Sequence, residues 1–383
     1  MTHLYIFLFF IFIAGATYGQ IYSSIPNNAQ IVFACDTANE YYRYSGDSVK
    51  SNELYVMDTL GTPSSVTRIT YDNYLYFHFA VSPDRKKIAA VRVLNDTDPP
   101  SGLLNPVDQK SIWILDLVSK ASWTVDLGLD AGWGGVDWDP DNNHIYAAID
   151  SAGVFNIYKI NINDTTFTNV TSGIDGALGL SMGKVVTDVS VSNDGEWIAF
   201  ATKKIIPTGL EKKSRIAVCK TNGDSAKWVT SGGNLFGDTQ VPTGCRVYSY
   251  GDYDPEFSPD GNWIVSMRFT DVDTNWCLPT STIIKMKCDG TDSTLFTMPD
   301  STASYGLPDW NYSGTKIVMS EWNENQVYIG TAVMNADGTQ YTRLTTLPAT
   351  SMISNTYARF MAPVYPLSID ELTTEKIKIF PNP

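Results

Sequence analysis

Short segments of alternating apolar and polar residues recur along this chain, and a tight polar turn separates the two members of each pair. In the clearest copy, Pro255 and Phe257 alternate with Glu256, and the turn Ser258–Gly261 follows. Proline presets φ for such a turn, aspartate caps it through its side chain, and glycine accepts a positive φ. A second alternating segment, Trp263–Met267, comes next. This pattern predicts a β-hairpin.

Copies of this hairpin recur at regular intervals. If the position of Pro259 is taken as a marker, the equivalent residues are Pro26, Pro83, Pro140, Asn193, Pro259 and Tyr312. Successive markers are 57, 57, 53, 66 and 53 residues apart. Most copies are followed by a second hairpin, as at 54–61, 216–223, 284–290 and 332–338. Two hairpins supply the four strands of one propeller blade, so the repeats predict an all-β, six-bladed β-propeller.

The two halves of the repeat resemble the TolB-type propeller repeat. The resemblance rests on Phe-Ser-Pro-Asp-Gly-Asn-Trp-Ile at 257–264 and on Met-Asn-Ala-Asp-Gly at 334–338 with Arg-Leu-Thr at 343–345. It covers about residues 25–367, and we assign the propeller domain to 21–367. The first copy lacks an innermost strand. We expect Phe360–Pro366 to supply it, with Pro363 in the place of Pro255, which would close the ring and leave no open inner edge.

Both ends of the chain resemble export signals. Leu4–Ala14 is an unbroken apolar run followed by small residues, which predicts a signal peptide over 1–19. After a linker from residue 368, an alternating strand and Pro-Asn-Pro at 376–383 resemble the opening of a type IX secretion sorting domain, truncated at this point. A complete domain would imply the type IX secretion machinery as a partner; a stray strand with a turn is the alternative. We expect a secreted or cell-surface monomer, with the periplasm as the alternative location.

Composition narrows the classes of partner. Hydrophobic residues make up 43% of the 383 residues and aromatic residues 12%, which is enough for a large core. The net charge of −14 disfavours nucleic acid and anionic membranes as partners, and no segment after the signal peptide is apolar enough to span a bilayer. Of the five cysteines, Cys245 and Cys277 lie in loop-like stretches of one repeat. We predict that these two form a disulfide, with metal binding by the cysteines as the alternative.

Alignment of the repeats brings several titratable residues into register. His78, Asp188 and Asp254 stand five residues before the marker, and another set stands three before it, comprising Asp137, Glu256 and Asp309. The inner strands of a propeller line its channel, so we expect these six side chains to converge there and bind a ligand. Clustered carboxylates can hold Ca²⁺ or a cationic group. The alternative is that they cap turns and strand ends.

Other motifs are weaker. The Asp-x-Asp-x-Asn run at 271–275 has the spacing of a calcium loop but lacks the following glycine and the distal glutamate, which favours a solvated loop. Trp133, Tyr250 and Trp276 are expected in inter-strand loops, where they could stack on sugars; packing in the core is the alternative for the tryptophans.

No set of catalytic residues is apparent in the sequence. After the signal peptide the histidines are His78 and His144, which leaves little room for a Ser-His-Asp arrangement, and there is no Gly-x-Ser-x-Gly elbow or P-loop. Oligogalacturonate lyases resemble this propeller in fold and use a histidine cluster for their metal. With His144 expected in a hairpin turn, this chain lacks the residues for such a cluster.

Three functional hypotheses follow from these patterns. The first is a binding module whose loops and channel mouth engage a protein or a glycan. The second is a polysaccharide lyase or hydrolase that uses Asp188, Asp254 and Asp309 with a divalent ion. The third, implied by the resemblance to TolB, is a periplasmic partner of an envelope complex.

Overall fold

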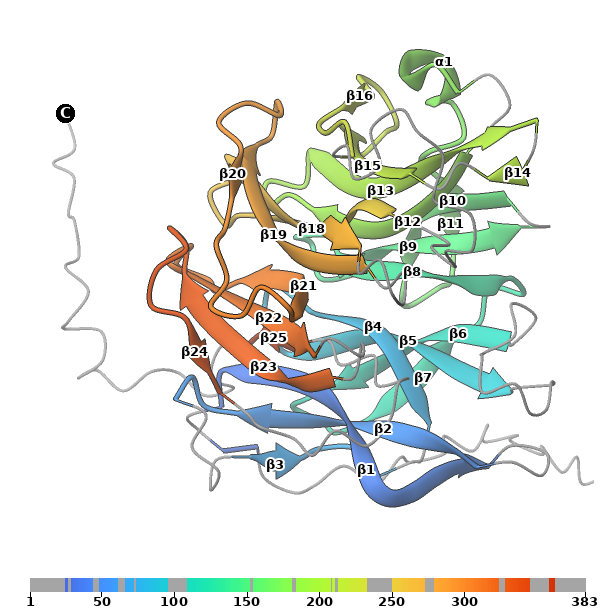
Figure 1. The fold of residues 1–383 in the computed structure, drawn as a ribbon. Helices are drawn as coiled ribbons and strands as arrows, with labels where there is room; N and C mark the ends of the chain where they lie inside the picture. The colour runs from blue at the N-terminus through green and yellow to red at the C-terminus, as the bar shows by residue number, and fades with distance from the viewer. Residues whose placement is uncertain are drawn as a thin grey trace, which may run out of the picture.

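The structure is a computed structural model in which strands form nearly all of the regular elements (Figure 1). It describes residues 25–26, 29–43, 48–60, 66–71, 74–95, 109–151, 154–180, 184–207, 209–210, 213–232, 250–272, 279–323, 328–344 and 358–361. Among these residues, α1 (Asp175–Leu178) is the one helix. The predicted signal peptide, the residues after Met361, and Cys245, Trp276 and Cys277 lie outside the described residues.

The strands form four four-stranded sheets and one nine-stranded sheet. The four smaller sheets contain β25 (Ala358–Phe360), β1 (Ile31–Arg43), β2 (Ser48–Met57) and β3 (Thr67–Arg68); β4 (Leu75–Val81), β5 (Lys87–Asn95), β6 (Gln109–Asp116) and β7 (Ser122–Val125); β8 (Asp130–Trp138), β9 (His144–Ser151), β10 (Val154–Asn161) and β11 (Phe167–Asn169); and β21 (Ser304–Trp310), β22 (Lys316–Trp322), β23 (Tyr328–Asn335) and β24 (Thr342–Arg343).

The nine-stranded sheet consists of two antiparallel runs. Its members are β12 (Lys184–Val191), β13 (Trp197–Ile206), β14 (Gly209–Leu210), β15 (Lys213–Lys220) and β16 (Lys227–Trp228), then β17 (Tyr250–Phe257), β18 (Trp263–Val272), β19 (Pro279–Lys287) and β20 (Thr294–Leu295). A short parallel pairing of β15 with β17, at Lys213–Tyr250 and Ser214–Gly251, joins the two runs. Every other pairing among the described strands is antiparallel, and apart from β25 the strands of each run follow one another in chain order.

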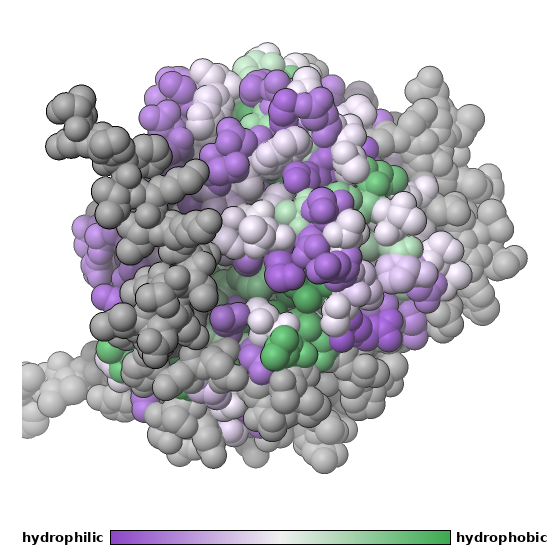
Figure 2. All heavy atoms as spheres, turned by 90° about the vertical axis from the view of Figure 1, so that its left-hand side faces the viewer, coloured by the Kyte–Doolittle hydropathy of each residue, from purple (hydrophilic) through white to green (hydrophobic). Residues whose placement is uncertain are grey.

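The sheets have a β-propeller arrangement. The first strand of each run contacts the first strand of the next, in the order β4, β8, β12, β17 and β21, and β25 contacts both β21 and β4. Hydrophobic clusters lie between neighbouring sheets; one packs Ile31 and Met57 against Val318 and Val333. On the face shown in Figure 2, mostly hydrophilic side chains surround smaller hydrophobic areas. None of the helices in the described ranges is long and apolar enough to cross a bilayer.

The marker turn forms as its residues predict. Ser258 Oγ donates to Asp260 Oδ1 at 2.5 Å, and the Trp263 amide donates to Ser258 Oγ at 2.9 Å. Gly261 has a φ of 70°, the left-handed conformation that glycine adopts without steric cost. The predicted hairpin over 255–267 is confirmed, since β17 pairs with β18 across this turn.

Several sequence-based positions need correction. Trp133, expected in a loop, lies within β8 because the strand extends back to Asp130, and Tyr250 begins β17. Asp271 and Val272 end β18, where they pair with Thr280 and Pro279 instead of beginning a loop.

The alignment of Pro363 with Pro255 is also wrong. In β25, Arg359 faces Val32 and Phe360 faces Ile31. In β17, the equivalent residues are Glu256, which faces Val265, and Phe257, which faces Ile264. Counted in the repeat, Arg359 therefore stands three residues before the marker position and Ala358 stands in the place of Pro255.

Candidate functional site

Backbone irregularities place the first set of aligned residues. The pairing register shifts between Thr187 and Val189, and again between Tyr253 and Glu256, so Asp188 and Asp254 lie in β-bulges. Their φ angles are 52° and 51°, in the left-handed region that aspartate tolerates better than most residues. His78 lies in the equivalent register shift of β4. A β-bulge redirects a side chain, and here the same device acts in three repeats.

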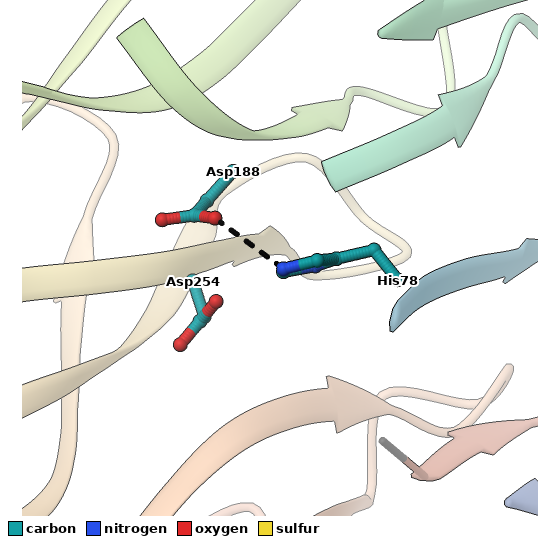
Figure 3. A group of neighbouring side chains, drawn as sticks. All are labelled: His78, Asp188 and Asp254. Carbon is teal, nitrogen blue, oxygen red and sulfur yellow. Dashed lines mark ion pairs between the residues drawn. The ribbon is translucent and has the colours of Figure 1, made fainter. Parts of the chain in front are cut away.

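These three side chains converge although they come from three separate strands, β4 in one sheet and β12 and β17 in the nine-stranded sheet. His78 Nε2 lies 3.8 Å from Asp188 Oδ1, and one ligand atom from each of His78, Asp188 and Asp254 lies within 4.8 Å of the other two. All three residues are buried, with exposed fractions of 6%, 9% and 8%. Figure 3 shows the imidazole pointing toward both carboxylates. The sequence aligned these residues, and the structure brings them together.

Two glycines allow this convergence. A Cβ on Gly134 would lie 2.5 Å from the Cα of Thr187, and a Cβ on Gly135 would lie 2.9 Å from the Cα of Asp188. Both distances are shorter than real Cβ contacts, so β8 and β12 can approach this closely only without side chains at these positions. At this position of the repeat, β8 therefore has glycine, whereas β4 and β12 on either side of it carry the side chains of His78 and Asp188.

The second set of aligned carboxylates surrounds Arg359, which sequence reasoning missed. Arg359 is 8% exposed and forms an ion pair with Glu256. Its Nε donates to the carbonyl oxygen of Phe79 at 3.2 Å, and its Nη1 donates to that of Pro308 at 3.1 Å. Asp309 lies nearby and accepts the Phe360 amide at 2.7 Å. The guanidinium therefore links the strands β4, β17 and β21.

Residues at these positions also connect neighbouring sheets through the backbone. Asp137 accepts the amide of Val191 at 2.6 Å, which is the repeat equivalent of the bond between Asp309 and Phe360. The Trp138 indole donates to the carbonyl oxygen of Ala80 at 3.1 Å, and the Trp310 indole donates in the same way to that of Glu256. Asp137 and Asp309 thus bind backbone amides at strand ends, which is the alternative to ligand binding that the sequence left open.

Burial dominates the electrostatics of the first set. Burial, and then the positive charge of Arg359, lowers the pKa of His78 to about 3, so its imidazole is neutral. Burial raises the pKa of Asp188 to about 6. Burial and the neighbouring Asp188 carboxylate raise the pKa of Asp254 well above its usual value.

The pKa values of the carboxyl groups in the second set are raised as well. Burial raises the pKa of Asp137 to about 6, and burial raises the pKa of Glu256 and of Asp309 as well. Burial alone would lower the pKa of Arg359, but Glu256, Asp309 and Asp137 raise it. The positive charge of Arg359 therefore acts on five carboxyl groups, those of Asp137, Asp188, Asp254, Glu256 and Asp309. Lys203 acts on Asp188 as a further cation. The cluster has fewer positive charges than acids, which favours the binding of a proton or a cation.

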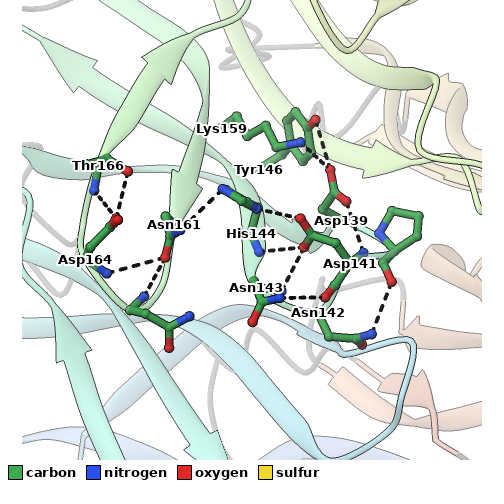
Figure 4. Close-up of polar contacts among 12 residues, drawn as sticks. Asp139, Asp141, Asn142, Asn143, His144, Tyr146, Lys159, Asn161, Asp164 and Thr166 are labelled. Carbon is green, nitrogen blue, oxygen red and sulfur yellow. Dashed lines mark hydrogen bonds and ion pairs between the residues drawn. The ribbon is translucent and has the colours of Figure 1, made fainter.

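The other histidine lies in a separate polar network. His144 begins β9, and its Nδ1 lies 2.6 Å from Asp141 Oδ2 in the marker turn (Figure 4). Lys159 Nζ donates to Asp139 Oδ2 at 2.6 Å, and the Tyr146 hydroxyl contacts the same oxygen at 3.3 Å. These contacts stabilise the turn. Within the described ranges, the group of potential metal ligands contains His78 and not His144.

Sequence reasoning also missed a hollow formed by the marker turns. It has a volume of about 420 Å³, and its lining includes Asn193, Ser258, Asp260, Trp263, Lys285 and Tyr312. Tyr312 is 73% exposed, and the Arg85 guanidinium covers one face of its ring at 4.0 Å. Lys285 Nζ lies 4.6 Å from the centroid of the Trp263 ring. Tyr312 served as a repeat marker, and the sequence did not indicate that three turns meet around it.

Cys219 is buried, Cys288 is half-buried, and both are free thiols. The predicted pair, Cys245 and Cys277, remains a prediction.

Comparisons with known proteins identify the fold. No protein-family model matches the sequence, and no curated protein matches it. Among solved structures, TolB from Acinetobacter baumannii is similar with a TM-score of 0.57 and 15% identity, over 88% of this chain and 68% of that one. A putative TolB from Agrobacterium tumefaciens is similar with a TM-score of 0.52 and 15% identity, over 87% of this chain and 98% of that one. The chain therefore has a TolB-like β-propeller fold.

Proposed function

We propose that this chain is a binding module, and that its ligand is a glycan held in the hollow at the marker turns. The hollow carries this proposal. It combines the exposed ring of Tyr312 with the polar side chains of the exposed residues Asn193 and Asp260. Binding sites commonly pair an aromatic or apolar wall with a few convergent polar groups. Because Arg85 covers one face of the Tyr312 ring, the opposite face can stack on a sugar ring.

Binding is favoured over catalysis by the burial of the central carboxylates. A lyase or hydrolase would need Asp188 and Asp254 to reach a polysaccharide, but these residues are 9% and 8% exposed. Asp309 is already engaged with the Phe360 amide. The hollow, by contrast, lies at the surface and requires no rearrangement of the central cluster.

The full architecture that we propose is a closed ring of six blades. It is supported by the two antiparallel runs within the nine-stranded sheet, each of which would be one blade, and by the pairing of β25 with β1. The contacts of β25 with β21 and β4 support closure at the same point. A closed ring fixes the spacing between turns, so the hollow formed by three of them would be rigid.

We propose that the module acts outside the cell or on its surface, reached through the signal peptide and, if a complete sorting domain follows, type IX secretion. The alternative is a periplasmic partner of an envelope complex, which the TolB-like fold permits. Fractionation of cells expressing the natural gene separates the two. Mature chain in the medium or on the outer surface supports the first, and mature chain confined to the periplasm supports the second.

The glycan proposal is tested with the purified chain on a glycan array, followed by titration of the best glycan against Y312A. Loss of a stacked aromatic ring is expected to weaken binding at least about tenfold. The matched control is F167A, because Phe167 is an exposed aromatic residue, 43% accessible, on a different part of the molecule. Equal effects of the two variants, or no binding on the array, would overturn the proposal. Specific capture of a protein through Tyr312 would favour a protein ligand instead.

A further inference from the structure

We propose that His78, Asp188 and Asp254 form a site for one divalent transition-metal ion of the zinc class. The three residues come from three strands, and each lies in a bulge at the same position of the repeat. Their ligand atoms lie within 4.8 Å of one another. The proposal is independent of the glycan site, because it concerns the buried centre and not the marker turns.

The distances suit a small cation after a slight contraction. Zinc binds imidazole nitrogen at about 2.0–2.1 Å and carboxylate oxygen at about 2.0–2.2 Å, so two ligand atoms on one ion lie at most about 4.3 Å apart. His78 Nε2 and Asp188 Oδ1, at 3.8 Å, already satisfy this limit. The largest separation in the group exceeds this limit by at most about half an ångström, which a side-chain rotation can close.

Asp254 provides a separate indication of a missing ligand. Its side chain is buried, with 8% of the residue exposed, and faces the other two residues (Figure 3). Among the described residues, its carboxylate accepts no hydrogen bond and forms no ion pair; the negative charge of Asp188 acts on it more strongly than the positive charge of the shared Arg359. A buried carboxylate without a hydrogen bond or a direct ion pair is costly. A cation bound between Asp188 and Asp254 would supply the partner.

The ligand set decides the class of metal. Ca²⁺ and Mg²⁺ prefer oxygen ligands, whereas imidazole nitrogen suits Zn²⁺ and its first-row neighbours. One imidazole with two carboxylates is therefore a mixed set that favours Zn²⁺ or Mn²⁺ over the Ca²⁺ expected from carboxylates alone. The surplus of five carboxyl groups over Arg359 and Lys203 also favours a doubly charged ion.

The test is calorimetric titration of chelator-treated full chain with ZnCl₂, MnCl₂ and CaCl₂, together with thermal unfolding in each metal. We expect one Zn²⁺ or Mn²⁺ per chain and a rise in Tm, because an ion that binds the folded state stabilises it. No binding by either ion, or tighter binding of Ca²⁺, would overturn the proposal.

Variants assign the binding to these residues. D254N preserves the shape of the side chain but removes a ligand charge, so Zn²⁺ affinity is expected to fall at least about tenfold. Without metal, D254N should unfold at the same temperature as the natural chain or higher, because it relieves repulsion from Asp188, and this readout separates a ligand role from a structural one. H144A is the matched control, since His144 pairs with Asp141 at the surface. Loss of binding in H144A, or full affinity in D254N, would contradict the assignment.

Discussion

The Arg359 guanidinium on β25 forms an ion pair with Glu256 on β17, and both side chains are close to nine-tenths buried. The two strands belong to different sheets and come from distant parts of the sequence. Arg359 also donates to the main-chain oxygens of Phe79 and Pro308. One side chain near the end of the chain thus holds together strands formed by much earlier segments.

Replacing Arg359 with methionine should destabilise the fold strongly. R359M leaves Glu256 and Asp309 buried without their cation, and removal of one partner from a buried pair typically costs about 3–5 kcal/mol. Urea unfolding followed by tryptophan fluorescence measures the effect as a lower midpoint. K287M is the control, because Lys287 pairs with Asp292 at an exposed position and should change stability by less than about 1 kcal/mol. Similar midpoints for the two variants would show that Arg359 does not have this role.

The sequence predicted those features that depend on local chemistry or on repetition. The Ser258–Gly261 turn follows from residues adjacent in sequence, and His78, Asp188 and Asp254 were aligned because repeats of one fold place equivalent residues together. Arg359 was missed because its strand, β25, lies near the end of the chain while its partner β1 lies near the start. The sequence next to Arg359 contains no recognisable marker turn. The same lack of a turn led to the incorrect alignment of Pro363. The register with Ile31 and Val32, a tertiary contact, fixes the position instead.

Features created by packing between repeats could not be predicted from the sequence either. Nothing local distinguishes Gly134 from a glycine in an ordinary strand. Its role depends on the backbone of Thr187, which lies 2.5 Å from the point that a Cβ on Gly134 would occupy. The hollow around Tyr312 likewise requires three turns, distant in sequence, to meet.

The G134A variant should lose both stability and metal affinity. The added methyl group would overlap Thr187 and push β12 away from β8, and overpacking of this kind typically costs about 1–3 kcal/mol. Because Asp188 follows Thr187, its carboxylate would move relative to His78, which should weaken Zn²⁺ binding. G173A is the control, since a Cβ there meets no atom within 4 Å. Unfolding midpoints and calorimetric titration of both variants measure the two effects; a G134A variant indistinguishable from G173A would refute the close-approach argument.

The cysteines should differ in reactivity. Burial raises the pKa of the Cys219 thiol to about 12, so at pH 8 the folded chain should not be alkylated there by iodoacetamide. Denaturation should make Cys219 reactive at once, which peptide mass spectrometry detects.

The same experiment tests the predicted disulfide. Without reductant, the denatured chain should expose two thiols fewer than its five cysteines, with Cys245 and Cys277 protected. Alkylation of all five would refute the disulfide.

Asp137 should give the fold a pH dependence opposite to that of an ordinary ion-paired carboxylate. Burial raises its pKa in the folded chain from 3.8 to about 6, so between these values the folded state binds a proton that the unfolded state does not. Stability from this group therefore rises as pH falls from about 7 to about 4. D137N removes the titration. The stability advantage of the natural chain over D137N should grow over this range by roughly 1–3 kcal/mol.

The control for this experiment is D260N. Hydrogen bonds from Ser258 and Asn262 outweigh burial and lower the pKa of Asp260 below 3.8, so its contribution is present above that pH and is lost only in more acidic solution. Chemical unfolding of the three proteins between pH 4 and 7 should show a slope difference for D137N and none for D260N. A slope in D137N equal to that of the natural chain would mean that Asp137 is ionised in the folded state, with Arg359 and the amides of Val191 and Trp138 fully offsetting its burial.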